Sequence, residues 1–247
     1  MTITDEAEKL VFTIGGDIRD YFNKYPLDEI YTYNFTVEDV RLFRNDEIKR
    51  INNLKNGFEK NKLLKIILSD KLSIAEDKLP YYNWIVKQWG GIKNFEKTID
   101  DIEDFFMNIN NKKLISKYYN SISSYSKIIS FTKPDEYFIF DSRVAYVLNW
   151  LLLKNYKSEN NFFIIPPGRN SDLVKYNMDT IINLYEKGGS IKYYEKKYLY
   201  FIYCEFVKKL FKENDNIEKP YYVEMMLFGL FDKICAEIKT KVKIIIV

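Results

Sequence analysis

Apolar residues recur at the three- and four-residue spacing of an α-helix through most of this chain, and this periodicity is the strongest constraint on its fold. Only residues 241–247 alternate in the manner of a strand, which predicts at most one small terminal strand. There is no internal repeat, no low-complexity linker and no alternation of strands with helices. The pattern therefore predicts an all-α protein of about nine or ten helices with short loops, around one continuous or bilobal core. The clearest helical stretches are 63–72, 80–89, 99–109, 144–154, 173–185, 198–211 and 223–239.

Several local signals set expected helix boundaries. Thr36 to Asp39 has the composition of an N-terminal cap and predicts a helix that carries Val40, Phe43 and Ile48. Gly90-Gly91 is a natural stop for the helix over 80–89. Residues 112–119 form a short basic segment that we also expect to be helical, whereas 160–170 predicts an irregular loop.

The chain contains no histidine, which removes several classes of chemistry. Ser-His-Asp and Cys-His nucleophilic sites, histidine-ligated zinc and histidine general bases are all excluded. The two cysteines, Cys204 and Cys235, are too few for a cysteine-rich metal site and lie in apolar helical contexts typical of core thiols. Any catalysis must therefore depend on carboxylates, lysine, tyrosine, serine or a metal bound by oxygen ligands.

Charge and hydropathy indicate where the protein is located more clearly than what it binds. The 38 basic and 35 acidic residues give a net charge of +3, which permits a nucleic-acid partner without arguing for one. The N-terminal residues carry acids where a signal peptide needs bases and an apolar run. No apolar stretch approaches the length of a membrane span, so we expect a cytoplasmic protein that does not enter a membrane.

The segment from Ser121 to Leu148 is the one part of the chain that has the pattern of an active site. A serine-rich turn opens a short helix that carries Lys127, because serine readily accepts amide hydrogen bonds at helix starts. Pro134 then interrupts that helix, and an extended apolar run over 137–140 leads into Asp141. Asp141 begins the next helix.

Each charged residue in this segment also has a simpler explanation. Asp141 fits the N-cap of its helix, and Lys127 fits a solvated helix position. Arg143 could anchor a carboxylate. A carboxylate fixed at a helix start beside aromatic residues nevertheless has restricted solvation and a defined direction, and both properties suit catalysis.

Together these residues resemble the core motif of the helix-hairpin-helix DNA glycosylases, the superfamily of endonuclease III, adenine glycosylase and 8-oxoguanine glycosylase. Lys127 stands where that family places its nucleophilic lysine, and Pro134 with the apolar run matches the approach to the catalytic aspartate. Asp141-Ser142-Arg143-Val144 is similar to the family's Asp-x-His-Val, with Arg143 in place of histidine. The hairpin has serines where the family usually has Gly-x-Gly, and the interval from lysine to aspartate is a few residues shorter.

The resemblance implies a bilobal fold with a cleft between the lobes. One helical lobe would span residues 29–135 and carry the hairpin with Lys127. The second would combine 1–28 with 136–247 and carry Asp141.

The resemblance also implies a mechanism in which a nucleotide is flipped out of double-stranded DNA and its base is held in a pocket. Asp141 would stabilise positive charge on the sugar or activate the nucleophile. If Lys127 attacks C1′ it forms a Schiff base with lyase activity, and otherwise water attacks; neither route needs a metal or a cofactor. Hairpin and nearby groups would contact DNA: Ser123, Ser124, Ser126, Lys112, Lys113 and Arg143.

Aromatic side chains are needed to wall such a pocket, and Tyr125, Trp84 and Trp89 are the candidates, although each also fits a packed core. Likewise, Lys112 and Lys113 fit an ordinary solvated basic run. The preferred function is excision of a damaged or modified base by a monomeric enzyme, in repair or in defence against phage DNA. The alternatives are a non-catalytic helical module for DNA binding or protein interaction, and a carboxylate–Mg²⁺ nuclease.

Overall fold

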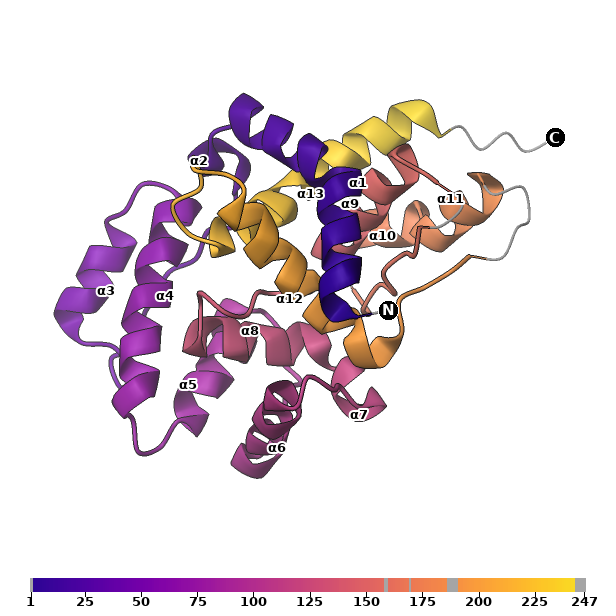
Figure 1. The fold of residues 1–247 in the computed structure, drawn as a ribbon. Helices are drawn as coiled ribbons and strands as arrows, with labels where there is room; N and C mark the ends of the chain where they lie inside the picture. The colour runs from indigo at the N-terminus through magenta and orange to yellow at the C-terminus, as the bar shows by residue number, and fades with distance from the viewer. Residues whose placement is uncertain (1, 158–159, 169, 186–190, 243–247) are drawn as a thin grey trace.

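The computed structural model of the chain describes residues 2–157, 160–168, 170–185 and 191–242. These residues are helical apart from loops and one isolated bridge between Phe162 and Tyr193, which confirms the all-α prediction (Figure 1). The helices are α1 (Ile3–Lys24), α2 (Leu27–Ile30), α3 (Asn45–Asn52), α4 (Gly57–Ile74), α5 (Leu79–Asn83), the π-helix η1 (Trp84–Trp89), α6 (Ile99–Asn110), α7 (Ser116–Tyr119), α8 (Ile122–Thr132), α9 (Ser142–Lys154), α10 (Ser171–Lys175), α11 (Met178–Tyr185), α12 (Lys196–Lys212) and α13 (Tyr221–Lys241).

The arrangement of the helices brings distant parts of the chain together. Helix α1 packs along α12, and α9 packs along α13, so both ends of the sequence join the same part of the molecule. Helix α8 packs against α4, α6 and η1 instead. In Figure 1, α3 to α6 occupy the lower left of the view, α9 to α11 with α13 occupy the upper right, and α8 and α12 lie between them. The segment between α8 and α9 therefore crosses from one group of helices to the other.

Helix α1 was not expected from the sequence. Its start is fixed by a reciprocal capping box, in which the Thr2 hydroxyl accepts from the Asp5 amide at 3.1 Å and Asp5 accepts from the Thr2 amide at 3.0 Å. Leu10, Ile14 and Ile18 are almost completely buried at helical spacing. Burying side chains of this size contributes about 1.5–3 kcal/mol each, which explains why the helix docks.

Two expected helix boundaries were wrong. Residues 37–44 form a loop, because the Asp39 carboxylate accepts a hydrogen bond from the Arg41 amide at 3.0 Å and closes a turn instead of capping a helix. The helix begins at Asn45, where the Arg44 amide donates to the Glu47 carboxylate at 2.8 Å. The stretch 173–185 is divided into α10 and α11.

The basic segment 112–119 is helical only over α7, because Lys112 takes a positive φ of 49° just after α6 ends. The described residues contain more helices than the predicted nine or ten. The excess arises because some expected helices are divided in two and because several helices have only four or five residues. The possible terminal strand begins at Lys241, which is the last residue of α13, and its residues 243–247 lie outside the described part of the chain.

The helix expected over 80–89 contains a change of helix type. It begins as α5 and continues as η1, in which the Gly90 amide donates to the Ile85 carbonyl five residues earlier, at 2.8 Å. A π-helical turn accommodates one more residue than an α-helical turn and often lies at a functional site. No helix among the described residues is long and apolar enough to cross a membrane.

Candidate active site

Helix α8 and the segment that follows it are held together by one buried serine. The Ser126 hydroxyl accepts from the Phe140 amide at 3.0 Å and donates to the Phe140 carbonyl at 3.3 Å. This pair of bonds fixes the extended segment alongside α8, one residue before Asp141. As a result, Asp141 and Lys127 lie close together although they belong to different helices.

The extended segment is buried and its backbone is satisfied by side chains. The Phe138 and Ile139 carbonyls accept from the hydroxyls of Tyr200 and Tyr203, each at 3.0 Å, and the Ile139 amide donates to Glu224 at 2.8 Å. Buried backbone groups need such partners, because leaving them unpaired costs about 1–3 kcal/mol each. The segment therefore presents Asp141 from a rigid support.

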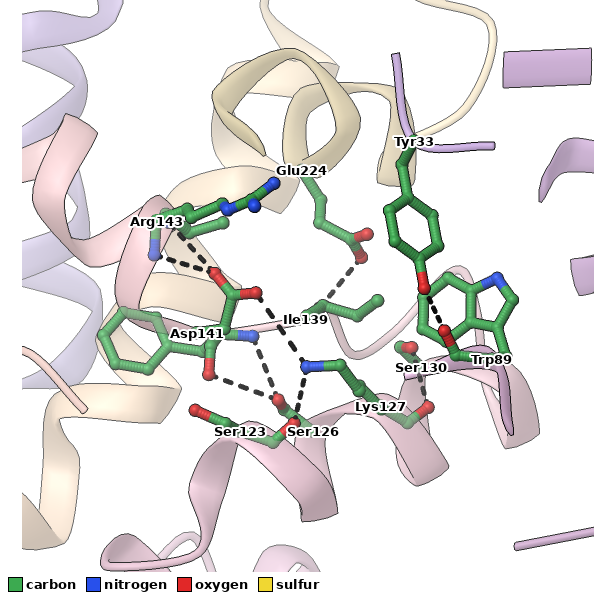
Figure 2. Close-up of polar contacts among 12 residues, drawn as sticks. Tyr33, Trp89, Ser123, Ser126, Lys127, Ser130, Ile139, Asp141, Arg143 and Glu224 are labelled. Carbon is green, nitrogen blue, oxygen red and sulfur yellow. Dashed lines mark hydrogen bonds and ion pairs between the residues drawn. The ribbon is translucent and has the colours of Figure 1, made fainter. Parts of the chain in front are cut away.

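Asp141 uses its two carboxylate oxygens differently. Oδ1 accepts from the amides of Arg143 and Val144, at 3.0 and 3.2 Å, and so caps α9, as the sequence predicts. Oδ2 lies 3.9 Å from Nζ of Lys127 (Figure 2). The cap thus orients the carboxylate and leaves one oxygen directed towards the lysine.

Lys127 is a buried amine rather than a solvated one. Only 7% of the residue is exposed, and Nζ donates to the Ser123 carbonyl at 2.9 Å. Burial lowers the pKa of the amine, and the charge of Arg143 lowers it further, whereas Asp141 and Glu224 act in the opposite direction. The net effect increases the fraction of Lys127 that is neutral, which is the nucleophilic form of an amine.

These two residues border a small chamber and a wider cleft. The inner chamber has a volume of about 200 Å³ and is lined by the apolar and aromatic groups Tyr31, Tyr33, Trp89, Gly90, Ile139, Val144 and Phe228 and by the charged residues Lys127, Asp141, Arg143 and Glu224. The outer cleft has about 750 Å³ and its more polar lining includes Lys97, Asn120, Ser121, Ser123, Ser124, Ser142 and Asn170. Gly90, Lys127, Asp141 and Arg143 line both, so the lysine and the aspartate stand at the junction.

The walls of the inner chamber are fixed by hydrogen bonds. Tyr33 donates to the Trp89 carbonyl, and the Trp89 indole donates to the Asn61 side chain at 3.0 Å. A Cβ at Gly90 would lie 2.8 Å from the Val86 carbonyl oxygen and 2.9 Å from Cδ of Lys127. Only glycine fits this position without moving the lysine.

A second buried ion pair lies behind the chamber. Nζ of Lys65 is 3.5 Å from Oε2 of Glu224, and both side chains are almost fully buried. Burial raises the pKa of the Glu224 carboxyl and lowers the pKa of the Lys65 amine, while each residue opposes the shift of the other. Glu224 is the acidic residue within the otherwise apolar run 221–227 of α13.

No family profile, curated protein or solved structure matches the chain. The function must therefore be argued from the geometry of this site.

The residues expected at the site are distributed unevenly around it. Lys127, Asp141, Arg143 and Trp89 line the inner chamber, and Ser123 and Ser124 line the outer cleft. Lys112 and Lys113 are exposed but contribute to neither lining.

Three expected contacts are not available in this structure. Ser126 is completely buried and already bonded to Phe140, so it cannot reach DNA. Tyr125 stacks on Phe105 with ring centroids 4.6 Å apart and lines neither cavity. Trp84 packs edge-on against Phe43 on another face of η1. Both aromatic residues are core groups because helical spacing turns them away from the chamber.

The sequence interpretation missed Glu224, Tyr31, Tyr33 and Phe228. Glu224 lies in the helix expected over 223–239, and its acidic side chain within the apolar run 221–227 was the available signal. The tyrosines lie in and beside a loop without periodicity, which offered no signal. Among the described residues, no group of three or more histidine, cysteine or acidic side chains could hold a metal ion.

Proposed function

We propose that the protein is a DNA glycosylase in which Lys127 and Asp141 act on the sugar of a flipped nucleotide. The observation that carries this proposal is their 3.9 Å approach at the junction between a small aromatic chamber and a wider polar cleft. The chamber is smaller than the roughly 300–1,000 Å³ of drug-sized sites, which suits a single planar base. The outer cleft is large enough for the sugar and phosphates that remain attached to the strand.

The proposed reaction follows from the states of the two side chains. As the bond from C1′ to the base breaks, its electron pair leaves with the base and positive charge develops on the sugar. The Asp141 carboxylate, held by the cap of α9, stabilises that charge. Neutral Lys127 attacks C1′ through its nitrogen lone pair, and the proton that the amine releases is taken up by the departing base. Opening of the sugar ring then gives a Schiff base. Water in place of the amine would leave an abasic site.

A two-lobed arrangement would explain how the pair meets. We infer one lobe over 29–135, which contributes Lys127 through α8, and another from 1–28 and 136–247, which contributes Asp141 through α9. This division is supported by the packing of α8 on α4, α6 and η1 and of α9 on α13 and α1. Duplex DNA would lie across the outer cleft, with its phosphates near the start of α8.

The test is release of a base from DNA. Purified protein is incubated with duplexes that carry oxidised, deaminated, mismatched or phage-type modified bases, and alkali then reveals abasic sites. Asp141→Asn should abolish release, because asparagine retains the cap but not the charge. Asp135→Asn is the matched control, since Asp135 is exposed and lies outside both cavities. Release that persists in Asp141→Asn would refute the assignment.

Borohydride trapping tests the role of the lysine. A covalent protein–DNA complex should form with the wild type and with Lys133→Met, whose lysine is exposed on the same segment, and should be lost in Lys127→Met. Base release without trapping would assign the attack to water. Substrates from damaged cellular DNA and from modified phage DNA would separate repair from defence.

A non-catalytic DNA-binding module is the second candidate, because the cap formed by Asp141 is a sufficient structural role for that residue. In that case Asp141→Asn would bind DNA as the wild type does, and no duplex of the panel would lose a base.

A further inference from the structure

Glu224 is a charged group in the inner chamber that the proposed reaction does not use. It lies on α13, is 2% exposed, and its carboxylate faces the space enclosed by Tyr33, Trp89 and Lys127 (Figure 2). Burying an acid costs several kcal/mol unless other groups compensate. A chamber that needed only to hold a flat apolar surface would be more stable with an apolar residue here.

The two oxygens of Glu224 have different surroundings. Oε2 accepts from the Ile139 amide at 2.8 Å and lies 3.5 Å from the Lys65 ammonium. Oε1 has no hydrogen-bond donor among the residues that the structure describes. Lys65 has no second carboxylate within ion-pair distance in the described chain, so its ammonium pairs with Glu224 alone and does so through Oε2. One carboxylate oxygen is therefore left to accept a hydrogen bond from whatever occupies the chamber.

Arg143 supplies the opposite chemistry at another wall. Its guanidinium lies 4.9 Å from the ring centroid of Phe228 and 5.5 Å from that of Phe231, and it has no ion-pair partner in the described ranges. A guanidinium donates hydrogen bonds only, whereas an ionised carboxylate only accepts them. The chamber thus offers an acceptor at Glu224 and donors at Arg143 to an occupant held between aromatic groups.

We propose that Glu224 selects a flipped base that carries an exocyclic amino group, as cytosine-, adenine- and guanine-type bases do. This inference rests on the proposed glycosylase function and assigns its substrate class. An amino group donates to Oε1 of Glu224, and ring nitrogens or carbonyls of the same base accept from Arg143. Uracil- and thymine-type bases instead present a carbonyl at the corresponding position, and its lone pairs repel a carboxylate.

The size of the preference follows from the bond that is lost. A hydrogen bond to a charged group contributes about 1.5–3 kcal/mol, so replacing the amino group by a carbonyl should weaken binding roughly 10- to 100-fold. A site built to hydrogen-bond its substrate rejects analogues that leave its buried polar group unpaired.

The experiment uses pairs of bases that differ at C4, where an amino group replaces a carbonyl, and at N3, which accepts a hydrogen bond in the amino base and donates one in the keto base. Duplexes carry 5-hydroxycytosine or 5-hydroxyuracil, and in a second pair 5-hydroxymethylcytosine or 5-hydroxymethyluracil, each opposite a tetrahydrofuran spacer so that neither base is paired. Fluorescence anisotropy measures binding to Asp141→Asn, which the proposed mechanism makes inactive, and base release is measured with the wild type. The amino base should be preferred in both assays.

In Glu224→Gln, the ratio of the affinity for the amino base to the affinity for the keto base should be close to one, because an amide can both donate and accept hydrogen bonds. Lys65→Met combined with Glu224→Gln keeps the test valid if the single variant folds poorly, since it removes both buried charges. Equal binding of the paired bases, or a preference for the keto base, would overturn the inference and leave the glycosylase function standing. Preferential binding with no release from any duplex of either panel would instead overturn the function.

Discussion

The Lys65–Glu224 pair allows the electrostatics of the site to be tested without any substrate. At 3.5 Å and an effective dielectric constant of about 20, two unit charges attract each other by about 5 kcal/mol. Lys65→Met removes that attraction, but Glu224 can respond by taking up a proton. From the ordinary value of 4.5, protonation at pH 7 costs about 3 kcal/mol, so the loss of stability should be about 2–3 kcal/mol.

The sign of the pH dependence differs between the two single variants. In Lys65→Met, Glu224 has a raised folded-state pKa, so the stability relative to wild type is highest near pH 4.5 and falls as the pH rises. In Glu224→Gln, the unpaired Lys65 has a pKa lowered from 10.5, so the deficit is greatest near neutral pH and shrinks as the pH approaches 10.5. The double variant contains neither charge and should recover most of the loss with no such slope.

Urea unfolding at pH 5, 7 and 9 measures these differences directly. For a domain of this length, a loss of about 3 kcal/mol corresponds to a fall in Tm of about 6–12 °C. Parallel pH slopes in the two single variants would refute the reasoning. So would a double variant no more stable than the weaker single variant, because the two residues would then not compensate each other.

Substitutions at three positions, Asp141, Lys127 and Gly90, test separate parts of the site. Asp141→Ala should cost about 1 kcal/mol of stability through the lost cap, whereas Asp141→Asn should cost much less, as measured by urea unfolding. Lys127→Met removes a buried charge, so its free energy of unfolding should exceed that of the wild type. The difference should be greatest at pH values below the lowered pKa of the Lys127 amine and should shrink as the pH rises to 10.5, as measured in the same assay. Gly90→Ala should cost about 1–3 kcal/mol, because its Cβ would crowd the Val86 carbonyl, and should reduce borohydride trapping, because the same Cβ would displace Lys127. A calorimetric melt with wild-type Tm would contradict this.

The sequence predicted the parts of the site that depend on local structure. Asp141 was identified from its immediate neighbours in the sequence, because it ends an apolar run and begins a strongly apolar helix. Helix α1 was missed although Thr2 and Asp5 form a capping box, because the N-terminal residues were considered only for a targeting signal.

The remaining parts depend on contacts between distant segments. Glu224 and Lys65 are separated along the chain and each stands in an apolar helix, so neither alone indicates a partner. Tyr33 reaches the chamber from a loop whose course is set by packing. Trp84 and Trp89 were equal candidates because both belong to one expected helix. Only tertiary packing separates them: Trp89 lines the inner chamber, whereas Trp84 packs against Phe43.

The π-helix between these tryptophans has a consequence for how the sequence can vary. Deleting one residue within 84–89 would restore α-helical hydrogen bonding, which is locally the more stable form, without any change in composition. Residues on either side of the turn would keep their directions, because the π-helical turn takes up its extra residue locally. Trp89 and Gly90 would then stay beside Lys127, and the change would be confined to the side chains inside the turn. A homologue with this single gap should therefore fold normally and keep the chamber, so the length of this one turn can vary more freely than the identity of the residues that follow it.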